Sequence, residues 1–363
     1  MVGENAIKMM TVGGGSSSLK VQKEILPLDG ISDRLRQINP QIEVDYARGY
    51  VGDTVQSYNG VTVGRSIAES RSPEVLLAEA VEKARKADCV IMVGGLNKAD
   101  YQDAEGHDRK EYALPYGQDK LIEALAKANG NIIYVNISGN GVEMPWLAKV
   151  PAVVQGWFAG SESGEALADV LVGDVNPSGK LPYTWYAKLN DCGAHALNTY
   201  PGTWRSDKQI IDEEYKEGIY VGYRWTDKQQ KKPLFAFGYG LSYTTFNISG
   251  LKVDKKEMTR DGKITFTATV TNTGKKAGAE VVQLYIRDVK STVDRPMKEL
   301  KGFQKVMLQP GESRDVSITI DNKALSFYDE AAGKWTSEAG EFEALVGNAS
   351  DNLRQSVKFT LKD

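Results

Sequence analysis

Apolar residues repeat with two different periods along the chain, and the change of period divides it in two. From residue 1 to about 185, short apolar runs alternate with segments in which apolar residues recur at helical spacing. Ser72, a typical N-cap, and Pro73, suited to a first helical turn, mark one helix start. The expected strands cover residues 89–93, 131–137 and 152–158, and the expected helices cover residues 73–87, 118–128 and 165–172. Apolar strands separated by helices favour an α/β fold with a largely parallel sheet covered on both faces.

The second half, residues 250–363, alternates apolar and polar residues with the period of two that is typical of strands. The expected strands cover residues 264–274, 280–286, 298–308, 314–320, 340–347 and 355–361. Short strands separated by Gly, Pro, Asn and Asp predict an all-β sandwich of about seven antiparallel strands. Between the halves, residues 186–249 are rich in aromatic residues rather than in Gly and Ser. We therefore expect a connector that packs onto both domains instead of a flexible linker.

The first residues resemble the end of a strand that enters a loop. A buried first strand needs about five residues, whereas only two residues precede Gly3. A Gly-rich segment follows at residues 13–18. This pattern predicts that the first strand is truncated and that the chain is part of a longer protein.

Composition excludes several classes of partner. The formal net charge of −3 gives no basis for binding nucleic acid or an anionic membrane, and no apolar run reaches the length of a membrane span. The start of the sequence also lacks the regions of a signal peptide. Two cysteines cannot form a disulfide framework or a zinc site. Cys89 is expected to be a buried thiol in a core strand, and whether it pairs with Cys192 stays open.

The densest candidate chemistry follows the apolar strand at residues 89–93. Asp103, Glu105, His107 and Arg109 lie within a few residues of one another, in a loop after a strand's carboxyl end, where α/β sheets place their ligands. A carboxylic acid here could protonate a leaving oxygen if its surroundings raise its pKa. The simpler alternative is an exposed acidic loop that forms salt bridges with Arg109 and Lys110. No metal site is expected, because His107 has no further His or Cys at ligand spacing.

Two other motifs give weaker signals. The Gly-rich segment at residues 13–18 lacks the ending of a phosphate-binding loop, so we expect a tight loop with close backbone approach instead. A serine hydrolase is disfavoured because Glu162 occupies the centre of the segment 160–164, where a nucleophile elbow needs Ser. Trp146 and Trp157 are interpreted as core residues rather than as sugar platforms.

Eight segments, in this order, resemble the C-terminal portion of glycoside hydrolase family 3, the β-glucosidase-like enzymes. They are residues 13–17, 105–109, 142–146, 168–182, 220–224, 237–243, 298–303 and 325–329. The resemblance covers essentially the whole chain. It implies an α/β-sandwich domain at residues 1–185 and a fibronectin type III-like domain at residues 250–363. It also implies that the family's leading barrel, which carries an Asp nucleophile, lies outside this chain.

The resemblance also implies roles for individual residues. Glu105 takes the place of the general acid/base in a retaining mechanism, which needs a second carboxyl group about 5 Å away. Asp103 is a second candidate for that role, and Arg109 would position the acid. The remaining substrate-binding candidates are Ser16, Ser17 and His107. No cofactor is implied.

The expected function is therefore that of a C-terminal fragment of a retaining exo-acting β-glycosidase. Terminal β-D-glucosyl residues of an oligosaccharide or β-glucoside are the expected substrate, the barrel domain is the expected partner, and the chain alone is expected to be inactive. The alternatives are a β-xylosidase of the same family, a stand-alone non-catalytic carbohydrate-binding or scaffold protein and, with least support, a flavodoxin-like binding protein. Resemblance favours a periplasmic or secreted location, and a cytoplasmic one stays open.

Overall fold

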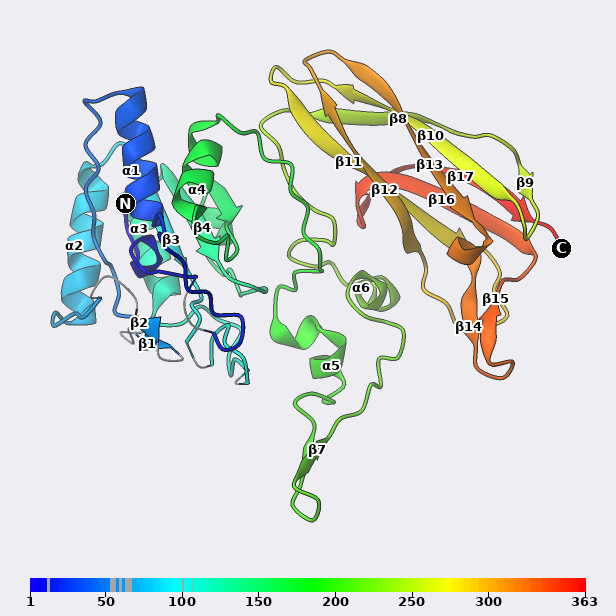
Figure 1. Ribbon diagram of the computed structural model, residues 1–363, viewed down its shortest axis with the longest axis horizontal. Coiled ribbons are helices and arrows are strands. Elements are labelled where there is room, and N and C mark those ends of the chain that lie inside the picture. Colours follow the sequence, from blue (N-terminus) through cyan, green and yellow to red (C-terminus); the bar gives the residue numbers. More distant parts are fainter. Residues whose placement is uncertain (12–13, 53–56, 59–60, 63–66, 100, 107) are drawn as a thin grey trace. The chain divides into compact units, whose positions relative to one another are not determined.

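The chain forms two compact units, Met1–Val175 and Asn176–Asp363. The computed structural model describes all residues except 12–13, 53–56, 59–60, 63–66, 100 and 107 (Figure 1). The side chains of residues 57–58 and 61–62 also lie outside the description.

A three-stranded parallel sheet forms the centre of the first unit, as the sequence predicted. Its strands are β3 (Val90–Gly95), β4 (Ile132–Ile137) and β5 (Ala152–Gln155), in that order. Val2 adds single parallel bridges to Met92 and Ala47, so the chain start lies alongside β3. In β3 and β4 five of the six positions are buried. This burial explains why these strands are apolar almost throughout.

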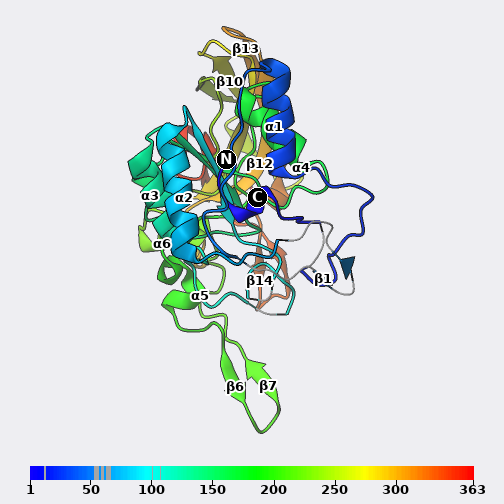
Figure 2. The ribbon, with the colours of Figure 1, turned by 90° about the vertical axis from the view of Figure 1, so that its left-hand side faces the viewer.

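Helices pack on both faces of this sheet. Figure 2 shows α2 (Pro73–Lys86) and α3 (Gln118–Ala128) on one side of it, and α1 (Pro27–Ile38) and α4 (Ser163–Val172) on the other. The predicted start of α2 is confirmed, because the Ser72 side chain accepts a hydrogen bond from the backbone of Val75. The short elements of the unit are η1 (Glu4–Ala6), β1 (Ser57–Tyr58), β2 (Val61–Thr62) and η2 (Leu147–Lys149).

The contact between α1 and α4 depends on two glycines. A Cβ atom on Gly30 would lie 2.3 Å from the backbone of Gly164, and a Cβ atom on Gly164 would lie 2.3 Å from the carbonyl oxygen of Leu26. Ile31 and Leu167 from the same helices pack with Val93 and Val135 of the sheet in one core cluster. The helix α1 was not predicted from the sequence. It contains Asp-Gly at residues 29–30, a pair that is typical of a turn.

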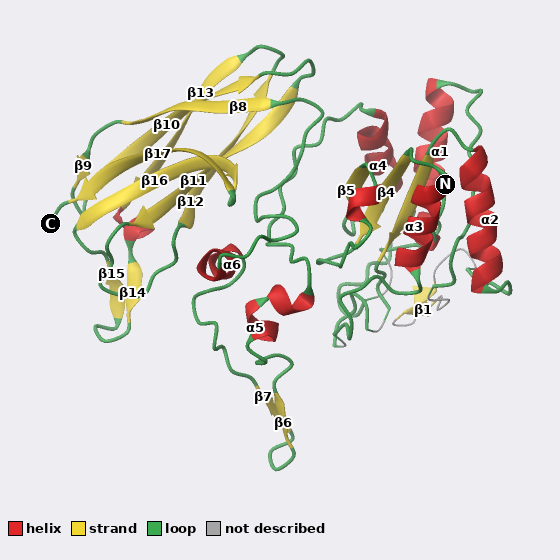
Figure 3. Cartoon of the chain, turned by 180° about the vertical axis from the view of Figure 1, so that it is seen from behind, coloured by secondary structure: helices red, strands yellow, loops and turns green. Residues whose placement is uncertain are grey.

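The C-terminal part of the second unit is a β-sandwich, as predicted (Figure 3). One sheet has the strand order β13-β10-β8 and the other β12-β11-β16-β17-β9, antiparallel except between β17 and β9. The strands are β8 (Phe246–Val253), β9 (Glu257–Met258), β10 (Lys263–Asn272), β11 (Gly278–Asp288), β12 (Glu299–Leu308), β13 (Ser313–Asp321), β16 (Gly340–Ala349) and β17 (Asn352–Leu361). Phe266, Phe342 and Phe359 lie in the core between the sheets. β8 was not predicted.

Shorter elements complete the second unit. They are η3 (Leu189–Asp191), α5 (Gly193–Ala196), α6 (Tyr223–Gln229), η4 (Asn322–Leu325), and the strand pairs β6 (Thr203–Arg205) with β7 (Ile210–Asp212) and β14 (Phe327–Asp329) with β15 (Lys334–Thr336). Aromatic contacts join the connector residues to the sandwich, with the rings of Tyr223 and Tyr285 centred 5.8 Å apart. None of the described helices has the length and apolar character needed to cross a membrane.

Candidate functional site

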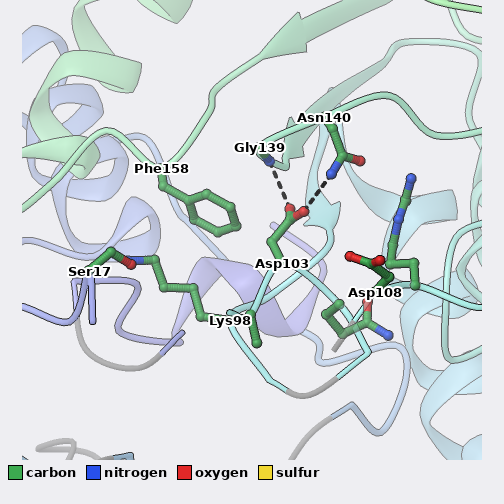
Figure 4. Close-up of a pocket in the computed structure, with 10 residues that line it drawn as sticks. Ser17, Lys98, Asp103, Asp108, Gly139, Asn140 and Phe158 are labelled. Atoms are coloured by element: carbon green, nitrogen blue, oxygen red, sulfur yellow. Dashed lines mark hydrogen bonds between the residues drawn. The ribbon is translucent and has the colours of Figure 1, made fainter. Parts of the chain in front are cut away.

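The candidate site lies at the carboxyl ends of the parallel strands. A pocket of about 480 Å³ opens there (Figure 4), and its wall combines residues from the loops after β3, β4 and β5 with one from the Gly-rich segment. The lining residues are Ser17, Lys98, Gln102, Asp103, Ala104, Asp108, Arg109, Gly139, Asn140 and Phe158. This location agrees with the rule that α/β sheets bind ligands beyond their carboxyl ends.

Glu105 is exposed and lies against the Gly-rich segment. Its backbone N–H donates to the carbonyl oxygen of Gly14 at 2.9 Å, and its carboxylate accepts a hydrogen bond from the Ser16 N–H at 2.5 Å. Hydrogen bonds from the Ser16 side chain and backbone hold the pKa of the Glu105 carboxyl below its usual value. A Cβ atom on Gly15, whose φ is +98°, would lie 2.5 Å from Glu105. The expected tight loop with close backbone approach is therefore present, and the residue approached is Glu105.

Asp103 is half-buried and binds the loop that follows β4. One carboxylate oxygen accepts a hydrogen bond from the Gly139 N–H at 2.8 Å, and the other accepts one from the Asn140 side-chain amide at 2.8 Å (Figure 4). Burial raises the pKa of Asp103, against the opposing effects of these hydrogen bonds and of the Arg109 charge. The two candidate acids therefore differ: Asp103 is the one whose pKa is raised, and Glu105 is the one open to solvent.

Arg109 contacts the same loop after β4. Its guanidinium donates to the carbonyl oxygen of Gly141 at 2.6 Å and lies over the ring of Tyr112 at 5.6 Å. The positive charge also acts on the Asp103 carboxylate. Arg109 and Asp103 thus both connect the loop after β3 to the loop after β4.

A buried polar network supports that second loop. The Asn136 side-chain amide donates to the Ser138 hydroxyl at 2.8 Å and to the Gln155 side chain at 2.7 Å. The Ser138 hydroxyl in turn donates to the backbone carbonyl of Asn140 at 2.7 Å. Asn136 and Ser138 are fully buried, so their satisfied hydrogen bonds make the loop costly to displace.

Lys98 and Phe158 form another part of the pocket wall. The Lys98 ammonium lies 5.5 Å from the centre of the Phe158 ring, and burial lowers the pKa of Lys98. Figure 4 shows the Lys98 side chain extending toward Ser17. An aromatic ring beside hydroxyl, amide, carboxylate and ammonium groups suits a ligand that has both apolar faces and hydroxyl groups.

Sequence reasoning missed the residues supplied by the two later loops. Asn140 and Phe158 were not singled out, although Asn140 follows a predicted strand, Phe158 ends one, and both strands end at the same edge as residues 89–93. Residues 152–158 were predicted as one strand, but β5 ends at Gln155, and this early end leaves Phe158 in a loop. The position of a residue after a strand's carboxyl end was the signal that could have found them.

The other candidates predicted from the sequence have mixed outcomes. Ser17 lines the pocket, Ser16 binds Glu105, and His107 lies outside the described residues. The prediction of a buried Cys89 is wrong: β3 begins one residue later and Cys89 is exposed, a free thiol like Cys192. Within the described part of the chain, no group of three His, Cys, Asp or Glu side chains is arranged to hold a metal ion. Of the two tryptophans, Trp146 is fully buried as expected, whereas Trp157 is half-buried.

Comparison with curated proteins finds close relatives among β-glucosidases. The chain is 47% identical over 361 residues to beta-glucosidase BoGH3A of Bacteroides ovatus, and the match covers 99% of this chain but 46% of the relative. It is 39% identical over 361 residues to thermostable beta-glucosidase B of Acetivibrio thermocellus, again 99% of this chain and 44% of the relative. The chain therefore spans about half the length of these relatives.

Solved structures show the same relationship in three dimensions. The GH3 β-glucosidase of Bifidobacterium adolescentis superposes with a TM-score of 0.84 at 34% identity, over 99% of this chain and 48% of that one. The β-glucosidase of Kluyveromyces marxianus, solved in complex with glucose, superposes with a TM-score of 0.85 at 29% identity, over 100% of this chain and 58% of that one.

Family profiles cover most of the chain. The glycosyl hydrolase family 3 C-terminal domain matches residues 1–243, and the fibronectin type III-like domain matches residues 280–350. With the parallel sheet, the β-sandwich and the relatives above, these matches show that the chain belongs to glycosyl hydrolase family 3 and comprises the family's C-terminal domain and a fibronectin type III-like domain.

Proposed function

We propose that this chain is the C-terminal part of a retaining, exo-acting β-glucosidase and that Glu105 is its general acid/base. The observation that carries the proposal is the placement of Glu105, held by Gly14 and Ser16 and next in sequence to pocket-lining Ala104. The names of the relatives support glucose over xylose as the sugar. A β-xylosidase is the second candidate within the same mechanism.

Glu105 would act twice in each turnover. In the first step it donates its proton to the glycosidic oxygen while a carboxylate nucleophile attacks the anomeric carbon, which forms a covalent glycosyl-enzyme. In the second step its carboxylate removes a proton from the water that attacks the same carbon, and the nucleophile leaves. We assign the nucleophile to the part of the relatives that this chain does not span.

The state of Glu105 supports the further proposal that this chain alone is inactive. A proton donor must be protonated at the working pH, and efficient donors have their pKa raised by burial or by a neighbouring negative charge. Here the carboxyl group is exposed, and the Ser16 hydrogen bonds lower its pKa, so it is ionised at neutral pH. Glu105 therefore needs a less polar surrounding than this chain gives it before it can protonate a leaving group.

Complementation with the part of a relative that this chain does not span tests the proposal. The chain is assayed alone and after co-expression with the N-terminal half of BoGH3A, using a nitrophenyl β-glucoside and a β-linked glucose disaccharide. We expect no hydrolysis by the chain alone and hydrolysis by the pair. Glu105→Gln should lower kcat about 10²–10⁴-fold, and more for the disaccharide, because its poorer leaving group depends more on protonation.

Two controls make this test specific. Glu111→Gln removes another exposed carboxyl group from the same loop and should leave activity unchanged. Azide should restore part of the nitrophenyl glucoside turnover to Glu105→Ala, because the anion attacks the glycosyl-enzyme without a base. If the chain alone hydrolyses the substrate and this activity depends on Glu105, the proposal that the nucleophile lies outside this chain is contradicted. Unchanged activity of Glu105→Gln in the pair contradicts the role of Glu105.

A further inference from the structure

The segment that carries Glu105 is held from both ends by the loop after β4. Asp103, two residues before Glu105, accepts hydrogen bonds from Gly139 and Asn140. Arg109, four residues after it, donates to the carbonyl oxygen of Gly141. The three residues that receive these contacts are consecutive, so one short loop fixes both flanks of the acidic segment.

Both oxygens of the Asp103 carboxylate take part in these contacts. Each oxygen accepts one hydrogen bond at 2.8 Å, one from backbone and one from side chain. The backbone N–H of Asp103 donates to the carbonyl oxygen of Asn97 at 2.9 Å, and Asn97 is 2% exposed. Hydrogen bonds therefore fix Asp103 through both its main chain and its side chain. This arrangement suits a residue that holds a loop in place better than one that donates a proton.

The loop after β4 is itself held to the sheet by side-chain hydrogen bonds. The buried hydrogen bonds among Asn136, Ser138 and Gln155 connect it to the ends of β4 and β5. Ser138 passes this support on to Asn140, whose backbone carbonyl accepts from the Ser138 hydroxyl. A continuous set of hydrogen bonds thus runs from the sheet to Asp103, and Glu105 follows two residues later.

From these contacts we infer that Asp103 is a positioning residue that, with Asn140, fixes the place of Glu105, and that Asp103 does not transfer a proton itself. The inference rests on the proposed function of Glu105. A misplacement of about 1 Å in an acid can cost about 10²-fold in rate, so the loss of Asp103 should lower kcat much more than it raises KM.

Isosteric replacement separates positioning from proton transfer. Asp103→Asn keeps an oxygen that can accept from the Gly139 N–H, and its amide can donate to Asn140 once the Asn140 amide turns over. Asp103→Ala keeps neither contact. In the complemented enzyme we expect Asp103→Ala to lower kcat about 10²-fold and Asp103→Asn to stay within about tenfold of the parent, the cost of one hydrogen bond. Equal losses in both variants would overturn the inference, because a proton donor tolerates neither change.

A swap of the pair provides the matched rescue. Asn140→Asp alone places a second carboxylate against Asp103 and should lower kcat. Asp103→Asn combined with Asn140→Asp restores a donor opposite an acceptor and should recover most of that loss. A double variant no better than Asn140→Asp alone contradicts a direct role for the contact.

A measurement on the 363-residue chain needs no catalysis. Amide hydrogen exchange at Gly139 and Glu105 should become faster in Asp103→Ala and stay close to the parent in Asp103→Asn. Glu105→Gln in the complemented enzyme separates the two hypotheses: if it retains activity, the proposed function fails, whereas if only Asp103→Ala retains activity, the positioning inference fails. Unchanged exchange in Asp103→Ala would also overturn the inference.

Discussion

The two units use side-chain hydrogen bonds in different ways. In the β-sandwich, hydroxyl groups pair directly across the β10–β13 register, as Thr267 does with Ser317 and Thr271 with Ser313. In the first unit the bonds join loops that are far apart in sequence, as between the Glu105 carboxylate and the Ser16 N–H or between the Asp103 carboxylate and the Gly139 N–H. A strand ladder therefore follows from local alternation of residues along the chain, whereas the site depends on where three strands end.

The consequence is a difference in what each unit tolerates. The sandwich distributes its stability over a core in which every second residue of β10 is buried. The site instead concentrates its geometry in a few contacts between loops, such as those of Asp103 and Arg109. We therefore expect core substitutions to change stability most in the sandwich, and glycine substitutions to act locally in the first unit.

The largest effect should come from the sandwich core. Phe266 is 2% exposed and packs edge-to-face on Phe359 at 5.4 Å. Phe266→Ala should lower the free energy of unfolding of the sandwich by about 3–5 kcal/mol, measured by urea unfolding and by amide exchange in β10. The control Phe303→Ala changes a side chain that is 69% exposed and should stay within about 0.5 kcal/mol. If both variants lose a similar free energy of unfolding, burial in the core is not the cause of the loss.

A smaller loss is expected where α1 meets α4. Gly30→Ala places a Cβ atom 2.3 Å from the backbone of Gly164, so the helices must separate, at about 1–3 kcal/mol. In an open helix the same change would stabilise by about 1 kcal/mol, so the sign of the effect tests the contact. Gly130→Ala, with nothing within 4 Å of the added atom, is the control for thermal unfolding. A stabilised Gly30→Ala would contradict the packing.

The smallest change in stability, and the most local one, should follow Gly15→Ala. The added Cβ atom would overlap Glu105 and push its carboxylate away from Ser16, so the pKa of Glu105 should rise toward its usual value. The carboxyl carbon's chemical shift, followed against pH, measures this pKa. Gly160→Ala is matched, because Gly160 also has a positive φ but has nothing within 4 Å. An unchanged pKa in Gly15→Ala would show that Ser16 does not stabilise the carboxylate.

The same contact has a defined pH dependence. Because the folded chain lowers the pKa of Glu105, its contribution to stability is present above the unfolded value and is lost as pH falls through the folded value. Gly15→Ala should remove that contribution and flatten this part of the stability profile. Gly160→Ala should leave the slope unchanged.

Elements with one dominant local signal were predicted well. The range 118–128 expected for a helix agrees with α3, and the ranges expected for β3 and β4 are correct to within two residues. The missed helix α1 contains Gly30, which in the sequence alone is typical of a turn. Its role in the helix becomes clear only from the structure, where it lies against Gly164. Cys89 was predicted to be buried, but it lies one residue before the start of β3 and is exposed, whereas the next residue, Val90, is buried. Local propensity is decisive where it is strong, and tertiary packing overrides it elsewhere.

Sequence alone determined the two classes of fold, because the period of apolar residues is a local property of the chain. The acidic segment after the first apolar strand was predicted as the candidate site from its position, and the role of Glu105 was implied by family resemblance and stays a prediction. Only the tertiary structure decided that Asp103 binds Gly139 and Asn140, that Ser16 binds Glu105, and that Lys98 and Phe158 line the same pocket. The physical reason is that these contacts join loops from different strand ends, and their geometry exists only once the parallel sheet has brought those ends together.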